Sequence, residues 1–417
     1  MAWKDDLEVM GRRAAEAARR LATTPTEVKN AALRAMAGAL RANGASMLEQ
    51  NRLDLEDGRA AGLTNALLDR LALDAARVES MATGLEEIAA FRDPVGEVLG
   101  MWNGEKGIRI GQVRVPLGVV GIIYEARPNV TADATGLCLK SGNAVILRGG
   151  KEALRSNTII AKLLSEAADE SGIPGGSVQF LATPDREASV GLMQLPYLDV
   201  LIPRGGLKLK ESVMQNARVP YIMTGVGNCH TFVDASADVD MAVNIVVNAK
   251  CQRPGVCNAM ETLLIHRDVA ARFIPAGLAA LEERGVELRG DEAVRALFPS
   301  AKPASEEDWE TEFYDLILAV RVVDSLEAAM DHISRYGTRH SEAIVTESYA
   351  SAQTFLSGVD AAAVYVNAST RFTDGGVFGF GAEMGISTQK LHARGPMGVA
   401  QLTSTKFIIY GNGQTRG

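Results

Sequence analysis

The sequence contains few cysteines, and none of them is spaced like a metal or redox motif. The 417 residues include four cysteines, none in a Cys-x-x-Cys pair, and five scattered histidines. Structural zinc needs four grouped nitrogen or sulfur ligands, so this pattern argues against a zinc site and against a disulfide framework. We expect no bound metal, and thiols that stay reduced, as in a cytoplasmic protein.

The sequence also lacks an excess of positive charge and a long apolar run. Its formal net charge of −8 argues against a general nucleic-acid-binding protein, which needs a basic surface. The longest apolar stretches, such as residues 115–124, are far shorter than the roughly 20 residues that span a bilayer. The charged start of the chain lacks the apolar segment of a signal peptide. We therefore expect no nucleic-acid partner and no membrane attachment.

The Gly-x-Gly-x-x-Gly fingerprint of standard dinucleotide-binding proteins is absent as well. Gly225 and Gly227 have no third glycine at the required position, and Gly379 and Gly381 miss it by one residue. Neither pair follows a strand and opens a helix, as the phosphate-binding mechanism requires. The sequence therefore argues against a standard Rossmann dehydrogenase.

What the sequence contains is a helical start followed by alternating strands and helices, the pattern of an α/β protein with a parallel sheet. Its length implies two or more structural units. Thr24 and Glu27 have the spacing of a capping box. Hydrophobic periodicity predicts helices over 5–21, 26–43, 45–60, 74–91, 152–170, 185–194, 206–217, 238–249, 268–284, 325–335 and 349–357. Short apolar runs predict strands over 144–147, 178–181, 198–202, 262–265, 316–322, 343–345 and 362–366.

Two further β segments lie outside this alternation. Residues 108–115 alternate apolar and polar side chains, as a half-buried strand does. The Pro-Leu-Gly sequence at 116–118 supplies a turn before the apolar run 119–124, so we interpret the segment as a hairpin. Residues 402–410 predict a separate terminal strand.

Two strand-to-helix turns are candidates for phosphate binding. The strand that ends at Arg148 runs into two glycines and Lys151, and these cations could grip a phosphate at a helix N-terminus. Gly205 and Gly206 follow a second strand in the same way. Ordinary βα turns have the same pattern, so both interpretations stay open from the residues alone.

Cys257 is the candidate nucleophile. It follows a Pro-Gly turn and has Lys250 and Arg253 nearby, a basic context of the kind that activates thiolates. A lone cysteine is more often a small buried core residue. The basic, glycine-containing context favours catalysis, whereas we expect Cys138 and Cys229 to be dispensable and Cys251 to have no role.

The segment 252–261 resembles the nucleophile segment of the aldehyde dehydrogenase superfamily, in the form found in its gamma-glutamyl phosphate reductase family. Further strings resemble the same family: 115–118, 123–131, 141–151, 201–206, 364–376 and 387–398. The resemblance implies an aldehyde dehydrogenase-like fold of three parts. These are an NADPH-binding domain over 1–108 and 127–229, a catalytic domain over 230–398, and an oligomerisation hairpin and arm over 109–126 and 399–417.

The resemblance also implies a reaction. It is the NADPH-dependent reduction of L-glutamate 5-phosphate to L-glutamate 5-semialdehyde and phosphate through a thioester on Cys257, the second step of proline biosynthesis from glutamate. Oxidising relatives carry a glutamate base in a Glu-Leu-Gly-Gly segment, whereas residues 224–228 here contain no acid. The family further implies a homodimer or a dimer of dimers, and functional coupling to a separate glutamate 5-kinase.

Residue roles follow from the same resemblance. Asn129 corresponds to the side-chain amide that stabilises the oxyanion together with the backbone N–H of Cys257. Arg148 and Lys151 occupy the positions that hold the adenosine ribose and its phosphate. Gly205 and Gly206 correspond to the pyrophosphate turn, and Glu312 to the glutamate that holds the nicotinamide ribose. The candidates for binding the substrate phosphate and carboxylate are Arg127, Lys250, Arg253 and Arg371.

Two alternatives remain. An oxidative aldehyde dehydrogenase would share the fold and Cys257, but it needs the missing glutamate base. A non-catalytic binding protein on this fold would be marked by loss of the nucleophile, and Cys257 is present.

Overall fold

The computed structural model describes residues 2–416 and has the expected α/β fold, divided into two compact units. Unit 1 comprises Met1–Thr224, Gly379–Gly385 and Met397–Gly417. Unit 2 comprises Gly225–Phe378 and Ile386–Pro396. The segments 379–385 and 397–398 thus belong to unit 1, whereas the resemblance assigns 230–398 as a whole to the catalytic domain. No helix within the described residues is both long and apolar enough to cross a membrane.

Unit 1 is built on a four-stranded parallel sheet with strand order β5-β4-β3-β6. The strands of unit 1 are β1 (Val98–Asn103), β2 (Arg109–Pro116), β3 (Val119–Tyr124), β4 (Ala144–Arg148), β5 (Val178–Phe180), β6 (Val200–Arg204) and β16 (Thr403–Tyr410). Its helices are α1 (Ala2–Leu21), α2 (Thr26–Ala42), α3 (Gly44–Ala60), α4 (Asn65–Leu71), α5 (Ala75–Ala90), α6 (Asn129–Lys140), α7 (Leu154–Glu170), α8 (Arg186–Met193) and α9 (Leu207–Asn216). Apolar side chains of α1, α8 and α9 form one core cluster with the sheet, while α2, α5, α6 and α7 pack against one another.

The predicted amino-terminal helices are confirmed, but the predicted capping box is wrong. Helix α2 begins at Thr26, its N-cap is Pro25, and no side chain caps it. The Thr24 hydroxyl instead donates to the carbonyl of Arg20, which closes the end of the preceding helix. Helix α4 is an additional short element that the sequence pattern does not predict.

The predicted hairpin over 109–124 is also wrong, because its two arms lie in different sheets. β3 pairs in parallel with β4 and β6, whereas β2 pairs antiparallel with β1 and β16. All six residues of β3 are buried, as expected for a parallel strand covered on both faces. The Pro-Leu-Gly segment therefore carries the chain from one sheet into the other. The continuous apolar run 119–124, which does not alternate, is the sequence signal for this arrangement.

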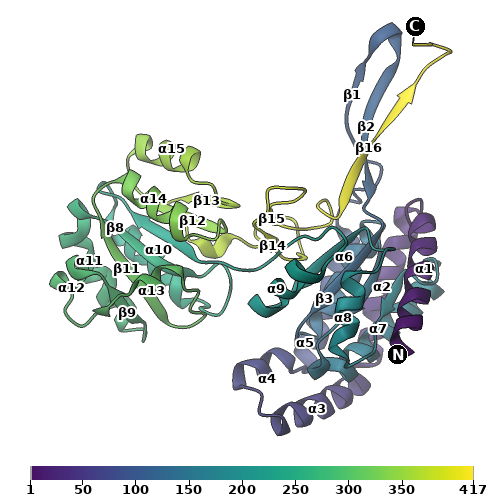
Figure 1. Cartoon of the computed structure of the whole chain (residues 1–417), viewed down its shortest axis with the longest axis horizontal. Coiled ribbons are helices and arrows are strands. Elements are labelled where there is room, and N and C mark those ends of the chain that lie inside the picture. Colours follow the sequence, from purple (N-terminus) through teal and green to yellow (C-terminus); the bar gives the residue numbers. More distant parts are fainter. Residues whose placement is uncertain (1, 417) are drawn as a thin grey trace. The chain divides into compact units, whose positions relative to one another are not determined.

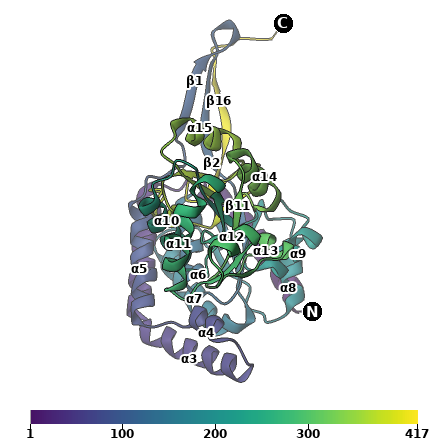
Figure 2. The ribbon, with the colours of Figure 1, turned by 90° about the vertical axis from the view of Figure 1, so that its left-hand side faces the viewer.

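β1, β2 and β16 form a three-stranded antiparallel sheet, which we call the arm. Figure 1 and Figure 2 both show the arm extending away from the helices of unit 1. The terminal strand predicted at 402–410 is confirmed as β16, which pairs along its whole length with β2. The arm exposes large apolar side chains: Val98, Leu99, Met101, Trp102, Phe407, Ile409 and Tyr410.

Unit 2 contains a seven-stranded sheet with the order β10-β9-β11-β8-β7-β12-β13, in which every pair is parallel. Its strands are β7 (Cys229–Val233), β8 (Met260–His266), β9 (Glu287–Gly290), β10 (Lys302–Pro303), β11 (Ile317–Val323), β12 (Ser341–Val345), β13 (Ala363–Val366), β14 (Ile386–Ser387) and β15 (Gly395–Pro396). Its helices are α10 (Val239–Cys251), α11 (Arg267–Glu282), α12 (Glu292–Leu297), α13 (Glu306–Glu310), α14 (Leu326–Tyr336) and α15 (Tyr349–Gly358). Apolar residues of α10 and α11 cover one face of the sheet, and those of α14 and α15 cover the other.

Candidate active site

Cys257 lies in the loop that joins the end of α10 to the start of β8 in unit 2. We call residues 252–259 the nucleophile loop. Its backbone packs tightly against Gly227, where an added Cβ would lie 1.4 Å from the carbonyl oxygen of Cys257. Only glycine allows this approach. The Gly-x-Gly segment at 225–227 therefore lies directly against the backbone of the nucleophile loop.

The Cys257 carbonyl also accepts a hydrogen bond from a buried thiol. Cys229 Sγ, at the start of β7, lies 3.2 Å from this oxygen. Burial raises the pKa of Cys229 well above its usual range, so this thiol remains protonated and able to donate. Cys229, which we expected to be dispensable, thus contacts the backbone of the candidate nucleophile.

Two predicted substrate-binding arginines, Arg253 and Arg371, belong to the same unit as Cys257. Burial lowers the pKa of Arg371, and repulsion from Arg253 lowers it further, while the Cys257 thiolate acts in the opposite direction. Arg371 Nε donates to Oε1 of Gln252 at 2.7 Å, which ties the arginine to the nucleophile loop. The contact with Gln252 places Arg371 against the nucleophile loop, where the charges of Arg253 and Cys257 also act on it.

Glu312 is held against the segment that backs the nucleophile. Its Oε1 accepts from the backbone N–H of Gly227 at 2.9 Å. Gly227 is in turn the residue packed on the carbonyl of Cys257. The structure therefore brings Glu312 and the nucleophile loop together within unit 2.

Lys250 is not available for ligand binding, which corrects its prediction as a substrate ligand. Its side chain is fully buried, and Nζ lies 2.5 Å from Oε2 of the equally buried Glu261. Burial lowers the pKa of Lys250 and raises that of Glu261 to about 7, and the pairing opposes both shifts. An ammonium satisfied in this way is not presented to a ligand.

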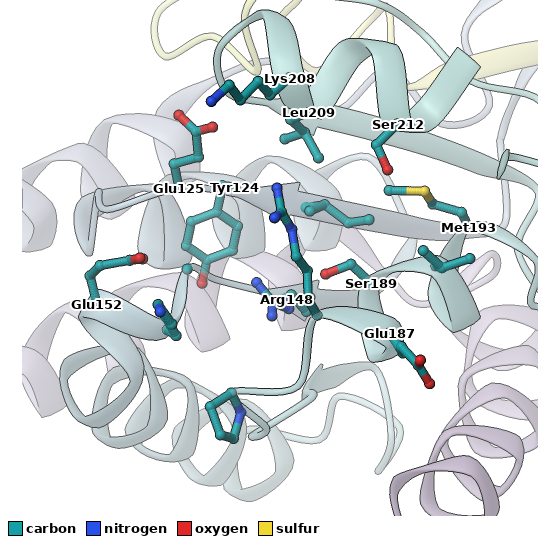
Figure 3. A pocket seen from close by; sticks show the side chains of 16 residues that line it. Tyr124, Glu125, Arg148, Glu152, Glu187, Ser189, Met193, Lys208, Leu209 and Ser212 are labelled. Atoms are coloured by element: carbon teal, nitrogen blue, oxygen red, sulfur yellow. The ribbon is translucent and has the colours of Figure 1, made fainter. Parts of the chain in front are cut away.

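Unit 1 holds a separate pocket of about 660 Å³ at the carboxyl ends of β3 and β4, where α8 and α9 also line it. Both Arg148 and Lys151, predicted to bind the cofactor phosphate, line this pocket. Figure 3 shows the Arg148 side chain extending into it between Tyr124 and Ser189. Arg186 and Lys208 add two more cations that sequence reasoning missed. They lie in the first turns of α8 and α9, where anions bind, and this position is the signal that could have found them.

Arg148 is the most informative residue of this pocket. Its side chain is only 8% exposed, and its terminal nitrogens donate to the carbonyls of Gly149 and Asp185 at 2.8 and 3.2 Å. Its Nε has no hydrogen-bond partner within residues 2–416. Burial lowers the pKa of Arg148, so an anion in this pocket would relieve the cost of burying the charge. The residues present therefore fit a phosphate group of a dinucleotide.

The second predicted turn begins where β6 ends. Gly206 is the N-cap of α9, and its N–H donates to Oε2 of Glu125 at 3.2 Å. A Cβ at Gly205 would lie 2.7 Å from the same carboxyl group. A side chain at Gly205 would have to displace the Glu125 carboxyl group, and the turn presents an N–H donor, as an anion-binding turn does. Glu125, which lines the pocket of unit 1, currently accepts that donor.

The remaining two predicted residues lie at the start of α6 in unit 1. Asn129 is exposed, and its Nδ2 donates to Oδ2 of Asp133 at 3.1 Å. Burial raises the pKa of Asp133 to about 6, and the Asn129 amide and Arg204 oppose this shift. Arg127 is exposed just before the helix. The sequence pattern did not predict α6, because threonine and glycine inside it have low helix propensity.

Known proteins resemble this chain over nearly its whole length. A profile of the aldehyde dehydrogenase family matches residues 1–296. A gamma-glutamyl phosphate reductase from Moorella thermoacetica is 61% identical over 412 residues, and one from Syntrophomonas wolfei is 59% identical over 414 residues, each covering 99% of both chains. The crystal structure of gamma-glutamyl phosphate reductase from Thermotoga maritima has a TM-score of 0.97 and 49% identity, covering 99% of this chain and 100% of the other.

Proposed function

The chain belongs to the aldehyde dehydrogenase family, among the gamma-glutamyl phosphate reductases, and from this premise we propose how its residues carry out the reaction. The enzyme reduces L-glutamate 5-phosphate to L-glutamate 5-semialdehyde and phosphate, the second step of proline biosynthesis from glutamate. The observation that carries the mechanism is Cys257, held on a loop packed against Gly227 with Arg253 and Arg371 beside it.

Cys257 acts first, as the nucleophile. Its sulfur attacks the acyl carbon of the mixed anhydride, the C–O bond to phosphate breaks, and phosphate leaves with the electron pair. This step forms a thioester on Cys257. Arg253 and Arg371 bind the anionic substrate and stabilise the charge that develops on the leaving phosphate. When the C–S bond breaks at the end of the cycle, the thiolate is restored and the aldehyde is released.

The cofactor is a nicotinamide dinucleotide, and we propose that it is NADPH. When bound, NADPH supplies the hydride that reduces the thioester carbonyl. Arg148 and Lys151 would hold the 2′-phosphate, because two cations meet in one pocket and the buried Nε of Arg148 lacks a partner among the described residues. Gly205 and Gly206 would lie against the pyrophosphate, and Glu312 would hold the nicotinamide ribose. Asn129 and Arg127 stay predictions for contacts with the substrate.

The segment before β7 supports reduction over oxidation. Residues 224–228 contain no carboxylate that could activate water against the thioester. Gly227 leaves no space for a side chain, because an added Cβ would lie 1.4 Å from the carbonyl oxygen of Cys257. The thioester is thus kept for hydride.

We also propose that the enzyme is a homodimer or a dimer of dimers in the cytoplasm. The arm supports assembly, because its large exposed apolar side chains and its unpaired strand edges are suited to association with a second copy. The four cysteines are free, which suits a reducing compartment. The substrate is a reactive acyl phosphate, so functional coupling to a separate glutamate 5-kinase would supply it directly.

An assay in the reverse direction tests the proposed reaction. Purified enzyme is mixed with glutamate 5-semialdehyde, phosphate and NADP⁺, and the absorbance at about 340 nm follows the reduced cofactor. We expect a rate that requires phosphate. An oxidative aldehyde dehydrogenase would form reduced cofactor without phosphate, and a binding protein would form none, so either result would overturn the proposal.

A further inference from the structure

A buried ion pair joins the two ends of the nucleophile loop. Lys250 is the penultimate residue of α10, and Glu261 is the second residue of β8, so the pair spans the chain on both sides of Cys257. Lys250 Nζ and Glu261 Oε2 lie 2.5 Å apart, and both side chains are fully buried. The contact closes the base of the loop and fixes the distance between the elements that carry it.

The second oxygen of Glu261 reaches the segment that carries Glu312. Glu261 Oε1 accepts from the backbone N–H of Tyr314 at 3.3 Å. Tyr314 has a φ of 56°, in the left-handed region, so this backbone conformation is one that a non-glycine residue adopts only when its surroundings hold it. The Tyr314 carbonyl also approaches the nucleophile loop, because an added Cβ at Gly255 would lie 3.6 Å from it.

Glu261 therefore links its own strand to two other segments. Its side chain binds Lys250 at the end of α10 and the backbone of the turn two residues beyond Glu312. The Lys250 ammonium is also 5.9 Å from the centre of the Phe313 ring, inside the same turn. Glu312 in turn holds Gly227, on which the Cys257 carbonyl packs. The pair thus stands at the point where the nucleophile loop, the Glu312 turn and the Gly227 segment meet.

We propose that Lys250 and Glu261 are positioning residues that hold Cys257 and Glu312 in the geometry of the reaction, in addition to supporting the fold. This inference rests on the proposed role of Cys257 as nucleophile. Stability alone is a poor reason for such a pair, because burying two charges costs about as much as their attraction returns. Apolar residues of similar volume often replace a buried ion pair without loss of stability. Replacing the pair is therefore expected to lower the catalytic rate without lowering the stability of the fold.

Unit 1 offers a matched control. Lys29 and Asp93 form another buried ion pair, with 2.5 Å between Nζ and Oδ2 and side chains 1% and 9% exposed. This pair connects α2 to the segment after α5 and contains no residue of the candidate site. Both pairs join a lysine to a carboxylate, and their burial is similar. They differ in position, because only one of them lies at the base of the nucleophile loop.

The test compares each pair with an apolar replacement. We would make Lys250→Met with Glu261→Met, and Lys29→Met with Asp93→Leu, and measure kcat, KM and thermal unfolding in the intact oligomer. Asp93 also faces the buried ammonium of Lys140, so the control carries Lys140→Met as a third change. Neither variant then buries an unpaired charge, and both should fold even where a single Lys→Met variant does not. We expect kcat to fall at least tenfold in the Lys250/Glu261 variant with KM changed less than threefold, although its Tm stays near that of the Lys29/Asp93 variant.

The outcomes separate this inference from the proposed function. If the Lys250/Glu261 variant kept kcat within twofold of the unaltered enzyme, or if both variants lost kcat equally, the positioning role would be wrong. Glu261→Gln provides a second reading, because it keeps an acceptor for the Tyr314 N–H and should retain more activity than Glu261→Met. The proposed function fails separately, through activity that survives Cys257→Ala in an otherwise unaltered chain.

Discussion

Arg148 in unit 1 and Lys250 in unit 2 are both buried cations at the end of a secondary-structure element, yet their surroundings differ. Arg148 donates to two backbone carbonyls and forms no ion pair within residues 2–416. Lys250 forms an ion pair with Glu261, from which it is separated by only 2.5 Å. The first cation faces a pocket, whereas the second is enclosed in the protein interior.

This difference separates a charge that can bind a ligand from a charge that holds segments of the protein together. A guanidinium whose hydrogen bonds go to neutral carbonyls, with the carboxylates of Glu152 and Asp185 acting without an ion pair, keeps its charge for an anionic ligand. An ammonium that is already paired with a carboxylate is not available to bind an anionic ligand. Sequence position alone does not separate these cases, because Arg148 and Lys250 each lie beside a glycine-containing turn. If these roles are right, unit 1 binds the cofactor and unit 2 carries the candidate nucleophile, and changes in the two units should have different effects.

The largest expected effect comes from removing the candidate nucleophile of unit 2. We expect Cys257→Ala to abolish turnover, because no thioester can form, while NADPH binding at the pocket of unit 1 survives. Steady-state kinetics and cofactor fluorescence measure the two properties separately. Cys138→Ala is the matched control, since Cys138 is buried in α6 of unit 1 and should leave kcat within about twofold. A Cys257→Ala enzyme with a tenth of the original rate would exclude covalent catalysis at this residue.

The next effect concerns the arm, which belongs to unit 1 alone. Deleting residues 400–417 removes β16 and leaves the edge of β2 unpaired, beside exposed Trp102 on β1. We expect monomers or insoluble protein, although Cys257 and the pocket of unit 1 are untouched. Light scattering on the purified truncation measures its mass. A soluble truncation with the oligomer number and activity of the intact chain would show that the arm is not the assembly element.

The third prediction concerns the pocket of unit 1, whereas the first concerned unit 2. Replacing Arg148 and Lys151 with glutamine should weaken NADPH binding about 100-fold or more, because each charge-assisted contact to phosphate contributes about 1.5–3 kcal/mol. NADH lacks the 2′-phosphate and should lose much less. Titration with both cofactors decides this, with Lys162→Gln on the exposed face of α7 as a control. Equal losses for NADPH and NADH would mean that these cations do not read the 2′-phosphate.

The smallest effect is a pH dependence located in unit 1. Burial raises the pKa of Asp133 to about 6, above the value of about 3.9 for a free aspartate. The folded state therefore holds this proton more tightly, and the free energy of unfolding should fall as pH rises from about 4 to about 6. Asp133→Asn should remove this slope and stabilise the protein by about 1–3 kcal/mol at neutral pH. Urea unfolding at several pH values measures it, and an unchanged slope would contradict the assignment.

Much of the fold was predictable because local patterns carry it. The amino-terminal helices have clear 3.6-residue periodicity, and the βα alternation after residue 144 has the short apolar runs of parallel strands. The hairpin at 109–124 failed because a Pro-Leu-Gly turn signal says only that the chain bends. It does not say which strand becomes the partner, and β2 found β1 and the distant β16.

The candidate site shows the same limit. Resemblance in the segment 252–261 singled out Cys257 as the candidate nucleophile, because such a candidate is recognised by its residue type and its neighbours in sequence. The role of Lys250 was mistaken, since its partner Glu261 lies eleven residues away and across a loop. The prediction that Cys229 is dispensable was made without knowledge of its contact with the Cys257 carbonyl, which joins residues 28 positions apart.

The sequence by itself supplied the candidates for the chemistry: Cys257 and the missing base at 224–228 through resemblance, and the cations that follow a buried strand at 148 and 151. These features depend on residue type and short spacing, which any conformation of the chain preserves. Only the tertiary structure decided which charges are free and which are paired. Burial and counterions depend on residues that are remote in sequence, so Arg148 and Lys250 became distinguishable when the chain had folded around them.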